Sequence, residues 1–318
     1  MSAGIGVALL GLGTVGSAVV RVMGERAKRL EAAAGRPLTV VGAAVRDVAK
    51  ARQVDAPVTA SAFDLLDDPA VAIVVEVIGG HRPAIDLHLA AFERGKHVVT
   101  ANKEVVAKEW RALHEAARQA KRELRFEAAV AAAVPVIAAA RALGAVRPRV
   151  LSGLVNGTTT YICSRMEAGA TFDAALREAQ EKGYAEPDPS ADVDGWDPAY
   201  KLAILISLLE GRWFPPDQVA RTTLRSVTAE QVQDASSRGN RLRYLAVADF
   251  GERATKARVA PQEVPAASLE GQASGPHNVV RLETDLAGTL TFMGPGAGGD
   301  ATASAILGDV IQIARQMR

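Results

Sequence analysis

The sequence predicts an α/β protein whose first half forms a doubly wound parallel sheet and whose second half is α+β. Short apolar runs alternate with helical patterns over roughly the first 130 residues, and a glycine-rich turn follows the first run. After about residue 132 the pattern changes to an Ala-rich helix, further helices and two alternating runs. Alternating runs of that kind are typical of antiparallel strands with one covered face.

The first half contains a series of strand-like apolar runs with helical patterns between most of them. Since strands that alternate with helices usually pair in parallel, these runs predict one open parallel sheet. The expected strands are residues 5–10, 38–45, 72–79, 97–100 and 124–130, with a helix after the first strand and helices around 88–94 and 109–121.

The second half combines helices with two runs that we expect to form antiparallel strands, 279–285 (VVRLETD) and 287–294 (AGTLTFMG). The glycine cluster at 294–300 then leads into a final amphipathic helix. The stretch 214–250 is less distinctive, and we expect helix, loop and one strand there without assigning chemistry to it.

Composition narrows the functional classes. The chain has 318 residues, of which 48% are hydrophobic, and this composition is typical of a globular protein. Its net charge of +1 gives no electrostatic reason to expect binding to nucleic acid or to an anionic membrane. The single cysteine, Cys163, and five scattered histidines predict neither a disulfide nor a zinc cluster. The longest apolar tract, 128–140, contains Pro135 and is shorter than the ~20 residues that span a bilayer. The N-terminus lacks a basic leader, so we expect a soluble, cytoplasmic protein.

A glycine motif follows the first expected strand. Gly11-Leu-Gly13-Thr-Val-Gly16 fits G-x-G-x-x-G between a strand and a helix, which is the context that a dinucleotide-binding loop requires. Glycines permit the tight turn and let the backbone approach a pyrophosphate at the helix N-terminus. The sequence therefore predicts a Rossmann-type sheet that binds NAD(P) through Gly11, Gly13, Thr14, Val15 and Gly16, although a tight turn without a ligand would give the same pattern.

Basic residues after the second expected strand bear on the choice of cofactor. Arg46 precedes Asp47, and Lys50 follows shortly after. Arginine suits the 2′-phosphate of NADP, whereas an acidic residue suits the ribose of NAD. We therefore expect NADP(H) to be preferred, with NAD(H) possible, the alternative being a solvated turn. Lys103, in a loop after the fourth expected strand, is a further candidate contact or else a solvated lysine.

The most specific stretch of the chain runs from Glu186 to Lys201 and places five carboxylates ahead of one lysine. Asp197 is expected to be the N-cap of a helix, with Pro198 at the first helical position and Lys201 in the first turn. A cation placed there opposes the helix dipole, so Lys201 should lose its proton more readily than a solvated lysine and could serve proton transfer.

Three other interpretations of this stretch are a solvated loop, a calcium loop and a Schiff-base lysine. A solvated loop with an exposed Asp197–Lys201 pair remains open from spacing alone. A calcium loop is excluded, because the alignment of the motif would put Lys201 where a bidentate glutamate is needed. A Schiff-base lysine is unnecessary if a nucleotide cofactor transfers hydride.

Together these motifs resemble the homoserine dehydrogenase family over nearly the whole chain. The shared segments are GLGTVG at 11–16, VIGG at 77–80, TANK at 100–103, GLVNGTTTYI at 153–162, EKGYAEPDPSADVDGWDPAYKLAIL at 181–205 and GAG…TASA near the end. The resemblance implies NAD(P)H-dependent, reversible reduction of L-aspartate 4-semialdehyde to L-homoserine in threonine, methionine and isoleucine biosynthesis. It also implies a homodimer with an NAD(P)-binding domain at 1–132, a catalytic and dimerisation domain at 133–290 and a segment at 291–318 that packs back on the nucleotide-binding domain.

The resemblance assigns roles residue by residue. Lys201 corresponds to the proton donor, Lys103 to a second active-site lysine and Asp197 to a supporting carboxylate. The substrate ammonium would be held by Glu186 and Asp192, and its carboxylate by donors of the 156–159 loop, among them Gly157 and Thr158, unless that loop is only a polar turn. Gly296 joins the cofactor contacts. A sodium ion would be held mainly by backbone carbonyls, at positions matching Glu127, Val130, Ala132 and Val134.

The chain departs from the family pattern at two places, and two alternative functions remain open. Ala129 and the alanines at 131–133 stand where the family has small residues and glycines, and their methyl groups could crowd the nicotinamide or reshape the cation loop. The chain ends soon after its last helix, so we expect no ACT domain and no threonine feedback through one. An aspartate-semialdehyde dehydrogenase would need Cys163 as its nucleophile, and a non-catalytic NADPH sensor would leave the acidic stretch unexplained.

Overall fold

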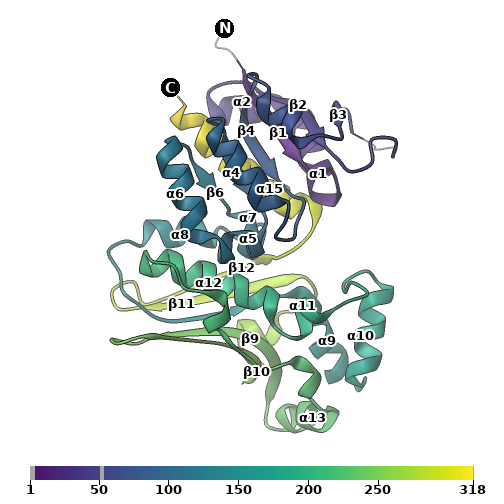
Figure 1. The fold of residues 1–318 in the computed structure, drawn as a ribbon. Coiled ribbons are helices and arrows are strands. Elements are labelled where there is room, and N and C mark those ends of the chain that lie inside the picture. The colour runs from purple at the N-terminus through teal and green to yellow at the C-terminus, as the bar shows by residue number, and fades with distance from the viewer. Residues whose placement is uncertain (1–3, 51–53, 318) are drawn as a thin grey trace. The chain divides into compact units, whose positions relative to one another are not determined.

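A computed structural model describes residues 4–50 and 54–317 of the chain (Figure 1). It divides into two compact units. The first contains the residues up to Ala133 together with those from Gly298 onward, and the second contains Val134–Ala297. Within the described ranges, no helix combines the length and the apolar character that crossing a bilayer requires.

The first unit is built on a six-stranded parallel sheet with the order β3-β2-β1-β4-β5-β6, which confirms the predicted doubly wound fold. From β1 the chain adds β2 and β3 on one side, and it then adds β4, β5 and β6 on the other side of β1. The strand order therefore reverses between β1 and β4. The strands are β1 (Ile5–Leu10), β2 (Leu38–Ala44), β3 (Val58–Thr59), β4 (Val71–Glu76), β5 (His97–Thr100) and β6 (Leu124–Arg125).

Helices complete this unit, and the C-terminal helix is one of them. In Figure 1 the yellow α15 lies beside the purple α1, and the two helices pack together. Buried α15 side chains such as Ile306, Val310 and Ile313 join the core around β1. The helices are α1 (Thr14–Glu25), α2 (Ala27–Ala34), α3 (Ala62–Asp67), α4 (Ala84–Glu93), α5 (Lys103–Lys108), α6 (Trp110–Ala120), α7 (Ala128–Ala131) and α15 (Gly299–Gln316).

The alanine-rich stretch differs from the prediction. The expected strand at 124–130 ends at Arg125, and residues 128–131 form the single turn α7, in keeping with the high helix propensity of alanine. The expected long helix is also interrupted. Ala132 has a φ of 44°, and α8 (Val136–Ala142) begins only after Pro135, which suits the start of a helix but not its interior.

The second unit contains a mixed sheet with the order β12-β11-β7-β9-β10-β8, and the predicted hairpin forms its β11 and β12. Because β12 extends to Pro295, the segment expected to join the first unit from residue 291 does so only from Gly298. The strands are β7 (Pro148–Leu154), β8 (Ala220–Arg221), β9 (Asn240–Phe250), β10 (Thr255–Pro265), β11 (His277–Thr284) and β12 (Thr289–Pro295).

Strand β10 was not predicted, because Pro261 and Pro265 interrupt its pattern. Its neighbour β8 pairs only with Arg258 and Val259, so the rest of β10 is an edge on that side, where proline is tolerated. The helices of this unit are α8, α9 (Gly157–Glu167), α10 (Phe172–Glu181), α11 (Ser190–Val193), α12 (Trp196–Glu210), α13 (Ala229–Ser237) and α14 (Leu269–Gln272), with short 3₁₀ turns at Pro216–Gln218 and Leu224–Ser226.

Candidate active site

The glycine loop of the first unit lies at the carboxyl ends of β1 and β4, where the strand order reverses. Gly11 has a φ of 102°, which favours glycine, and a Cβ there would lie 3.0 Å from the Val77 carbonyl oxygen. A Cβ on Gly16 would lie only 2.3 Å from the Gly11 carbonyl oxygen, so helix and turn are in close contact. By contrast, a Cβ on Gly13 would meet nothing within 4 Å, so this position faces open space.

These three positions match the three tasks of a dinucleotide loop, namely the tight turn, the close approach of a pyrophosphate and the packing of helix on strand. Helix α1 starts at the exposed Thr14, and its first turn presents backbone N–H groups at the positive end of the helix dipole. Val15 lies in the same turn and is half-buried. The first unit therefore has a backbone cradle suited to phosphate.

Three predicted cofactor contacts, Arg46, Lys50 and Lys103, follow strands that end at this edge of the sheet. Arg46, Asp47 and Lys50 follow the end of β2 and are exposed, with the Asp47 carboxylate accepting a hydrogen bond from the Ala49 amide. Lys103 was expected in a loop, but it is the first residue of α5, which follows β5. The reason is the N-cap residue Asn102, whose side chain accepts a hydrogen bond from the Val105 amide 3.2 Å away.

In the second unit, the predicted start of α12 is wrong by two residues. The helix begins at Trp196 with Gly195 as its N-cap (φ 81°), so Asp197 and Pro198 are helical and Lys201 lies in the second turn. Distant partners set this start, because a Cβ on Gly195 would lie 2.5 Å from the Tyr244 hydroxyl. The first-turn argument for easy proton loss by Lys201 therefore fails, since the dipole effect is confined to the first turn.

Lys201 is nevertheless held in a defined position. Its Nζ donates hydrogen bonds to the Val155 carbonyl oxygen at 2.6 Å and to the Asp197 carboxylate at 2.7 Å. The two side chains are only 12% and 7% exposed, which rules out the alternative of an exposed surface pair. Two of the three ammonium hydrogens are thereby used, which leaves one for a ligand.

Asn156 connects this lysine pair to a second carboxylate, a role that the sequence analysis missed. Its Nδ2 donates to Asp192 at 2.7 Å and to Asp197 at 2.9 Å, while its Oδ1 accepts from the Thr159 amide and caps α9. An Asn-Gly pair between a strand and a helix could have suggested the cap. The two amide bonds depend on tertiary structure, which no local pattern records.

The two carboxylates that share Asn156 affect each other. Burial, followed by the charge of Asp197, raises the pKa of the Asp192 carboxyl, against the lowering effects of Asn156 and Lys201. With one lysine beside two acids, the ionised cluster carries an excess negative charge. Such a cluster attracts a cationic ligand group.

The other predicted substrate residues are placed differently. Gly157 is the first residue of α9, and the Thr158 hydroxyl donates to the Tyr184 carbonyl oxygen at 2.7 Å. Glu186 is exposed, and its backbone carbonyl accepts a hydrogen bond from Gln180. Their contacts to a substrate stay predictions.

Gly296 has a packing explanation within the second unit. A Cβ there would lie about 2.0–2.2 Å from the side-chain amide of Asn278, and its own amide donates to the Pro276 carbonyl oxygen. Its role as a cofactor contact stays a prediction.

The predicted cation residues flank the break in the alanine-rich stretch. Glu127 and Val130 are buried, and the Glu127 amide donates to Asp309 of α15. Ala132 has a φ of 44°, a backbone region that favours glycine. The Val134 carbonyl accepts a hydrogen bond from the Val136 amide. Carbonyl and carboxylate oxygens are hard ligands, so this donor set fits sodium in its chemistry.

The cysteine required by the rival dehydrogenase is unsuitable as a nucleophile. Cys163 lies in α9 and is 1% exposed, and burial raises the pKa of its thiol to about 12. A thiol of that kind is protonated at neutral pH and inert.

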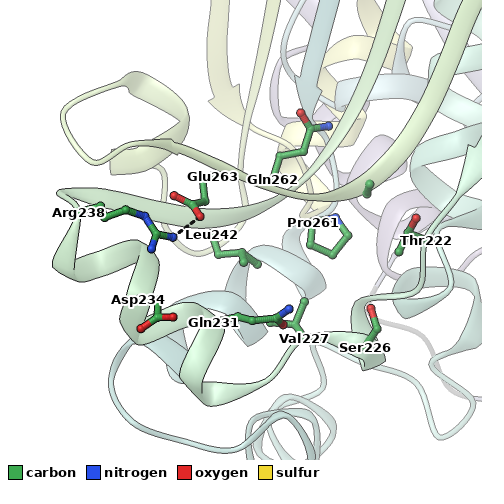
Figure 2. Close-up of a pocket in the computed structure, with 11 residues that line it drawn as sticks. Thr222, Ser226, Val227, Gln231, Asp234, Arg238, Leu242, Pro261, Gln262 and Glu263 are labelled. Carbon is green, nitrogen blue, oxygen red and sulfur yellow. Dashed lines mark hydrogen bonds and ion pairs between the residues drawn. The ribbon is translucent and has the colours of Figure 1, made fainter.

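A hollow of about 470 Å³ lies elsewhere in the second unit, between α13, β9 and β10. Figure 2 shows Arg238 and Glu263 facing each other across one side of it, where they form an ion pair. None of the predicted site residues lines this hollow.

Comparison with known proteins decides the family. The family profile "Homoserine dehydrogenase" matches residues 135–311, and the profile "Homoserine dehydrogenase, NAD binding domain" matches residues 11–127. The chain belongs to the homoserine dehydrogenase family. It is accordingly an NAD(P)-dependent oxidoreductase that interconverts L-homoserine and L-aspartate 4-semialdehyde, as the sequence resemblance predicted.

Individual relatives agree with the family assignment. The homoserine dehydrogenases of Corynebacterium glutamicum and Pseudomonas aeruginosa are 42% and 39% identical, each over 98% of this chain and 72% of the relative. The crystal structure of a homoserine dehydrogenase from Thiobacillus denitrificans superposes with a TM-score of 0.96 at 40% identity, covering 98% of this chain and 74% of the other. A hyperthermophilic archaeal homoserine dehydrogenase in complex with NADPH superposes with a TM-score of 0.82 at 26% identity, covering 99% of this chain and 99% of the other.

Proposed function

We propose that Lys201 is the proton donor for reduction of the aldehyde and that Asp197 holds it in position. The observation that supports this is the buried contact of the Lys201 ammonium with Asp197 and the Val155 carbonyl, which directs its remaining hydrogen. Negative charge develops on the aldehyde oxygen as hydride arrives, and an ammonium can stabilise that charge and then donate a proton.

We further propose that Asp192 binds the ammonium group of the substrate. Asp192 and Asp197 both accept from Asn156, and Lys201 forms its ion pair with Asp197 rather than with Asp192. A substrate ammonium beside Asp192 would neutralise the excess and remove the repulsion that raises the pKa of Asp192. Glu186 is proposed as a second acid for the same group on the strength of the family resemblance.

The cofactor supplies the hydride, and the first unit supplies the binding site. Gly11, Gly13 and Gly16 shape the phosphate cradle, and Arg46 is proposed to bind the 2′-phosphate. NADP(H) is therefore the expected preference, and the NADPH complex of the archaeal relative is consistent with it. Lys103, at the carboxyl end of β5, is proposed to contact the nicotinamide half.

Three further features are proposed, the first two of them from the family resemblance. Glu127, Val130, Ala132 and Val134 would hold a sodium ion that orders the surrounding backbone. The second unit would mediate a homodimer. The cytoplasmic location rests on composition and on the absence of paired cysteines in the sequence.

The decisive experiment measures NADPH oxidation by the purified protein with L-aspartate 4-semialdehyde, for the wild type and for Lys201→Ala. We expect kcat to fall about 10²- to 10⁴-fold, the usual contribution of a positioned general acid. Lys182→Ala is the matched control, because Lys182 is an exposed lysine of the same unit bound to Glu178. Unchanged turnover in Lys201→Ala would refute the role of Lys201.

Two other measurements, phosphate-dependent reduction of NADP and direct binding of NADPH, test the rival functions. Phosphate-dependent reduction of NADP that disappears in Cys163→Ala would identify the aspartate-semialdehyde dehydrogenase reaction. NADPH binding without turnover of either substrate would identify a sensor.

A further inference from the structure

The first unit contains a buried carboxylate that the proposed mechanism does not use. It lies at the carboxyl ends of the parallel strands, the edge that carries the glycine loop and that we call the nucleotide edge. Glu76 is the last residue of β4 and is 0% exposed. The Val77–Gly80 turn follows it and contacts the glycine loop, since a Cβ on Gly11 would lie 3.0 Å from the Val77 carbonyl oxygen and 3.3 Å from the Ile78 amide.

The carboxylate of Glu76 holds this turn directly. Its Oε1 accepts hydrogen bonds from the Ile78 amide at 2.7 Å and from the Gly79 amide at 3.2 Å. Gly79 and Gly80 have consecutive positive φ values of 78° and 71°, so the turn adopts a conformation that requires glycine. Glu76 therefore stabilises an exposed turn from below.

The other oxygen of Glu76 reaches the neighbouring strand. Its Oε2 accepts from the Thr100 hydroxyl at 2.7 Å, and the Thr100 oxygen accepts from the Asn102 amide at 2.9 Å. The Asn102 side chain donates to the Gly80 carbonyl at 2.7 Å and also caps α5, which begins with Lys103. One carboxylate thus connects the turn after β4 to the start of the helix after β5.

Glu76 is kept ionised in this buried place. Although burial alone raises the pKa of its carboxyl, the neighbouring His88 imidazole and the hydrogen bonds from the Thr100 hydroxyl and the Ile78 amide lower it overall. The His88 Nε2 lies 3.0 Å from Glu76 Oε2, and both side chains are completely buried. Buried charge is expensive unless it is well compensated, so the arrangement indicates a specific task.

We propose that Glu76 is a positioning residue for the nicotinamide half of the bound dinucleotide, because it fixes both the Val77–Gly80 turn and the start of α5. The strand order assigns the halves. By the general rule for doubly wound sheets, the adenosine half would lie over β1 and β2, near Arg46, and the nicotinamide half would lie over β4 and β5. This inference rests on the proposed binding of NADP(H).

The test measures dissociation constants directly, by the change in protein fluorescence, for NADPH and for 2′,5′-ADP, which lacks the nicotinamide half. Glu76→Ala leaves the turn amides without their acceptor, so the Kd for NADPH should rise about tenfold. The Kd for 2′,5′-ADP should stay within about twofold, because its contacts are separate. Glu76→Gln retains an acceptor for both amides and should bind NADPH more tightly than Glu76→Ala.

A second variant covers the case in which Glu76→Ala does not fold. Gly79→Ala places its Cβ in open space but strains the turn, so it perturbs the turn without touching the core. It should also weaken NADPH more than 2′,5′-ADP. Equal weakening of both ligands, or unchanged NADPH affinity with only a lowered Tm, would overturn the role of Glu76. A wild-type protein that binds no NADPH would instead refute the proposed function.

Discussion

The nucleotide edge of the first unit is made largely of backbone, whereas the lysine site of the second unit is made of side chains. At the first site, Gly11 and Gly16 provide a positive φ and a close approach, and Gly13 leaves space for a ligand. At the second site, Asn156, Asp192, Asp197 and Lys201 orient one another through hydrogen bonds that link α11, α12 and the N-cap of α9.

This difference determines how each site tolerates change. A backbone site is damaged when a side chain is added, because space and conformation are its working properties. A side-chain site is damaged when a charge or donor is removed, because the remaining partners stay buried without compensation. The predictions below separate these two kinds of sensitivity.

Among the variants that follow, the largest effect is expected from Asp197→Asn. The change preserves shape but removes the charge beside Lys201, and charge-assisted hydrogen bonds contribute about 1.5–3 kcal/mol. We therefore expect kcat/KM to fall about tenfold to a hundredfold, measured by steady-state kinetics with L-homoserine. Asp188→Asn, an exposed acid of the same stretch, is the control. Equal activity of both variants would show that the buried pair is not part of the reaction.

Gly16→Ala and Gly13→Ala form a matched pair in the backbone site. The Gly16 methyl would lie 2.3 Å from a carbonyl oxygen, so the free energy of unfolding should fall by about 1–3 kcal/mol. The Gly13 methyl enters open space, so this variant should retain stability and lose affinity for NADPH. Thermal unfolding and NADPH titration distinguish the two. A Gly13→Ala protein with unchanged affinity would argue against pyrophosphate at this loop.

Asn156→Ser tests the link between the two carboxylates. Serine still caps α9, but its single hydroxyl hydrogen cannot serve both Asp192 and Asp197. We expect kcat/KM to fall about tenfold. Thr171→Ser, at the N-cap of α10, should leave kcat/KM unchanged. If the two variants behaved alike, Asn156 would be a cap and nothing more.

His97→Gln should change stability without changing either site. Burial, assisted by the charge of Arg122, lowers the pKa of His97 to about 4, and its Nδ1 accepts the Glu123 amide. The unfolded chain has the higher pKa, so it binds more protons between about pH 6.5 and 4, and stability falls as pH decreases through this window. Near pH 5.5 the loss is about 1 kcal/mol after solvent screening. Denaturant unfolding at pH 7.5 and 5.5 should show that glutamine removes this dependence.

The smallest effect is expected from Ala132→Gly. Ala132 has a φ of 44° and a ψ of −107°, so glycine should relieve strain and raise the free energy of unfolding by about 0.5–1 kcal/mol. Ala133→Gly is the control, since Ala133 is not among the non-glycine residues with positive φ in the described chain. A loss of stability in Ala132→Gly would show that the methyl group contributes packing that exceeds the strain.

The sequence predicted the first site better than the second for a physical reason. Glycine at 11, 13 and 16 records a backbone requirement directly, so the strand, loop and helix were placed correctly. The start of α12 depends on Gly195 meeting Tyr244, which is distant in sequence, and on Arg221, whose guanidinium lies 3.4 Å from the centre of the Trp196 ring. No local pattern contains those contacts.

Other errors have the same origin. The prolines of β10 conceal a strand whose edge position becomes visible only when β8 is placed. The acid–lysine pair was found because its spacing is local, whereas the bridge through Asn156 connects residues about 40 positions apart.

The return of α15 to the first unit has a consequence for biosynthesis. A ribosome releases the chain from its N-terminus, so every strand of the second sheet has emerged before Ile306, Val310 and Ile313 can reach the core around β1. Until α15 is synthesised, the apolar surface of α1 that it covers stays exposed on the nascent first unit. Folding of the two units is ordered by translation, and the domain that starts first finishes last.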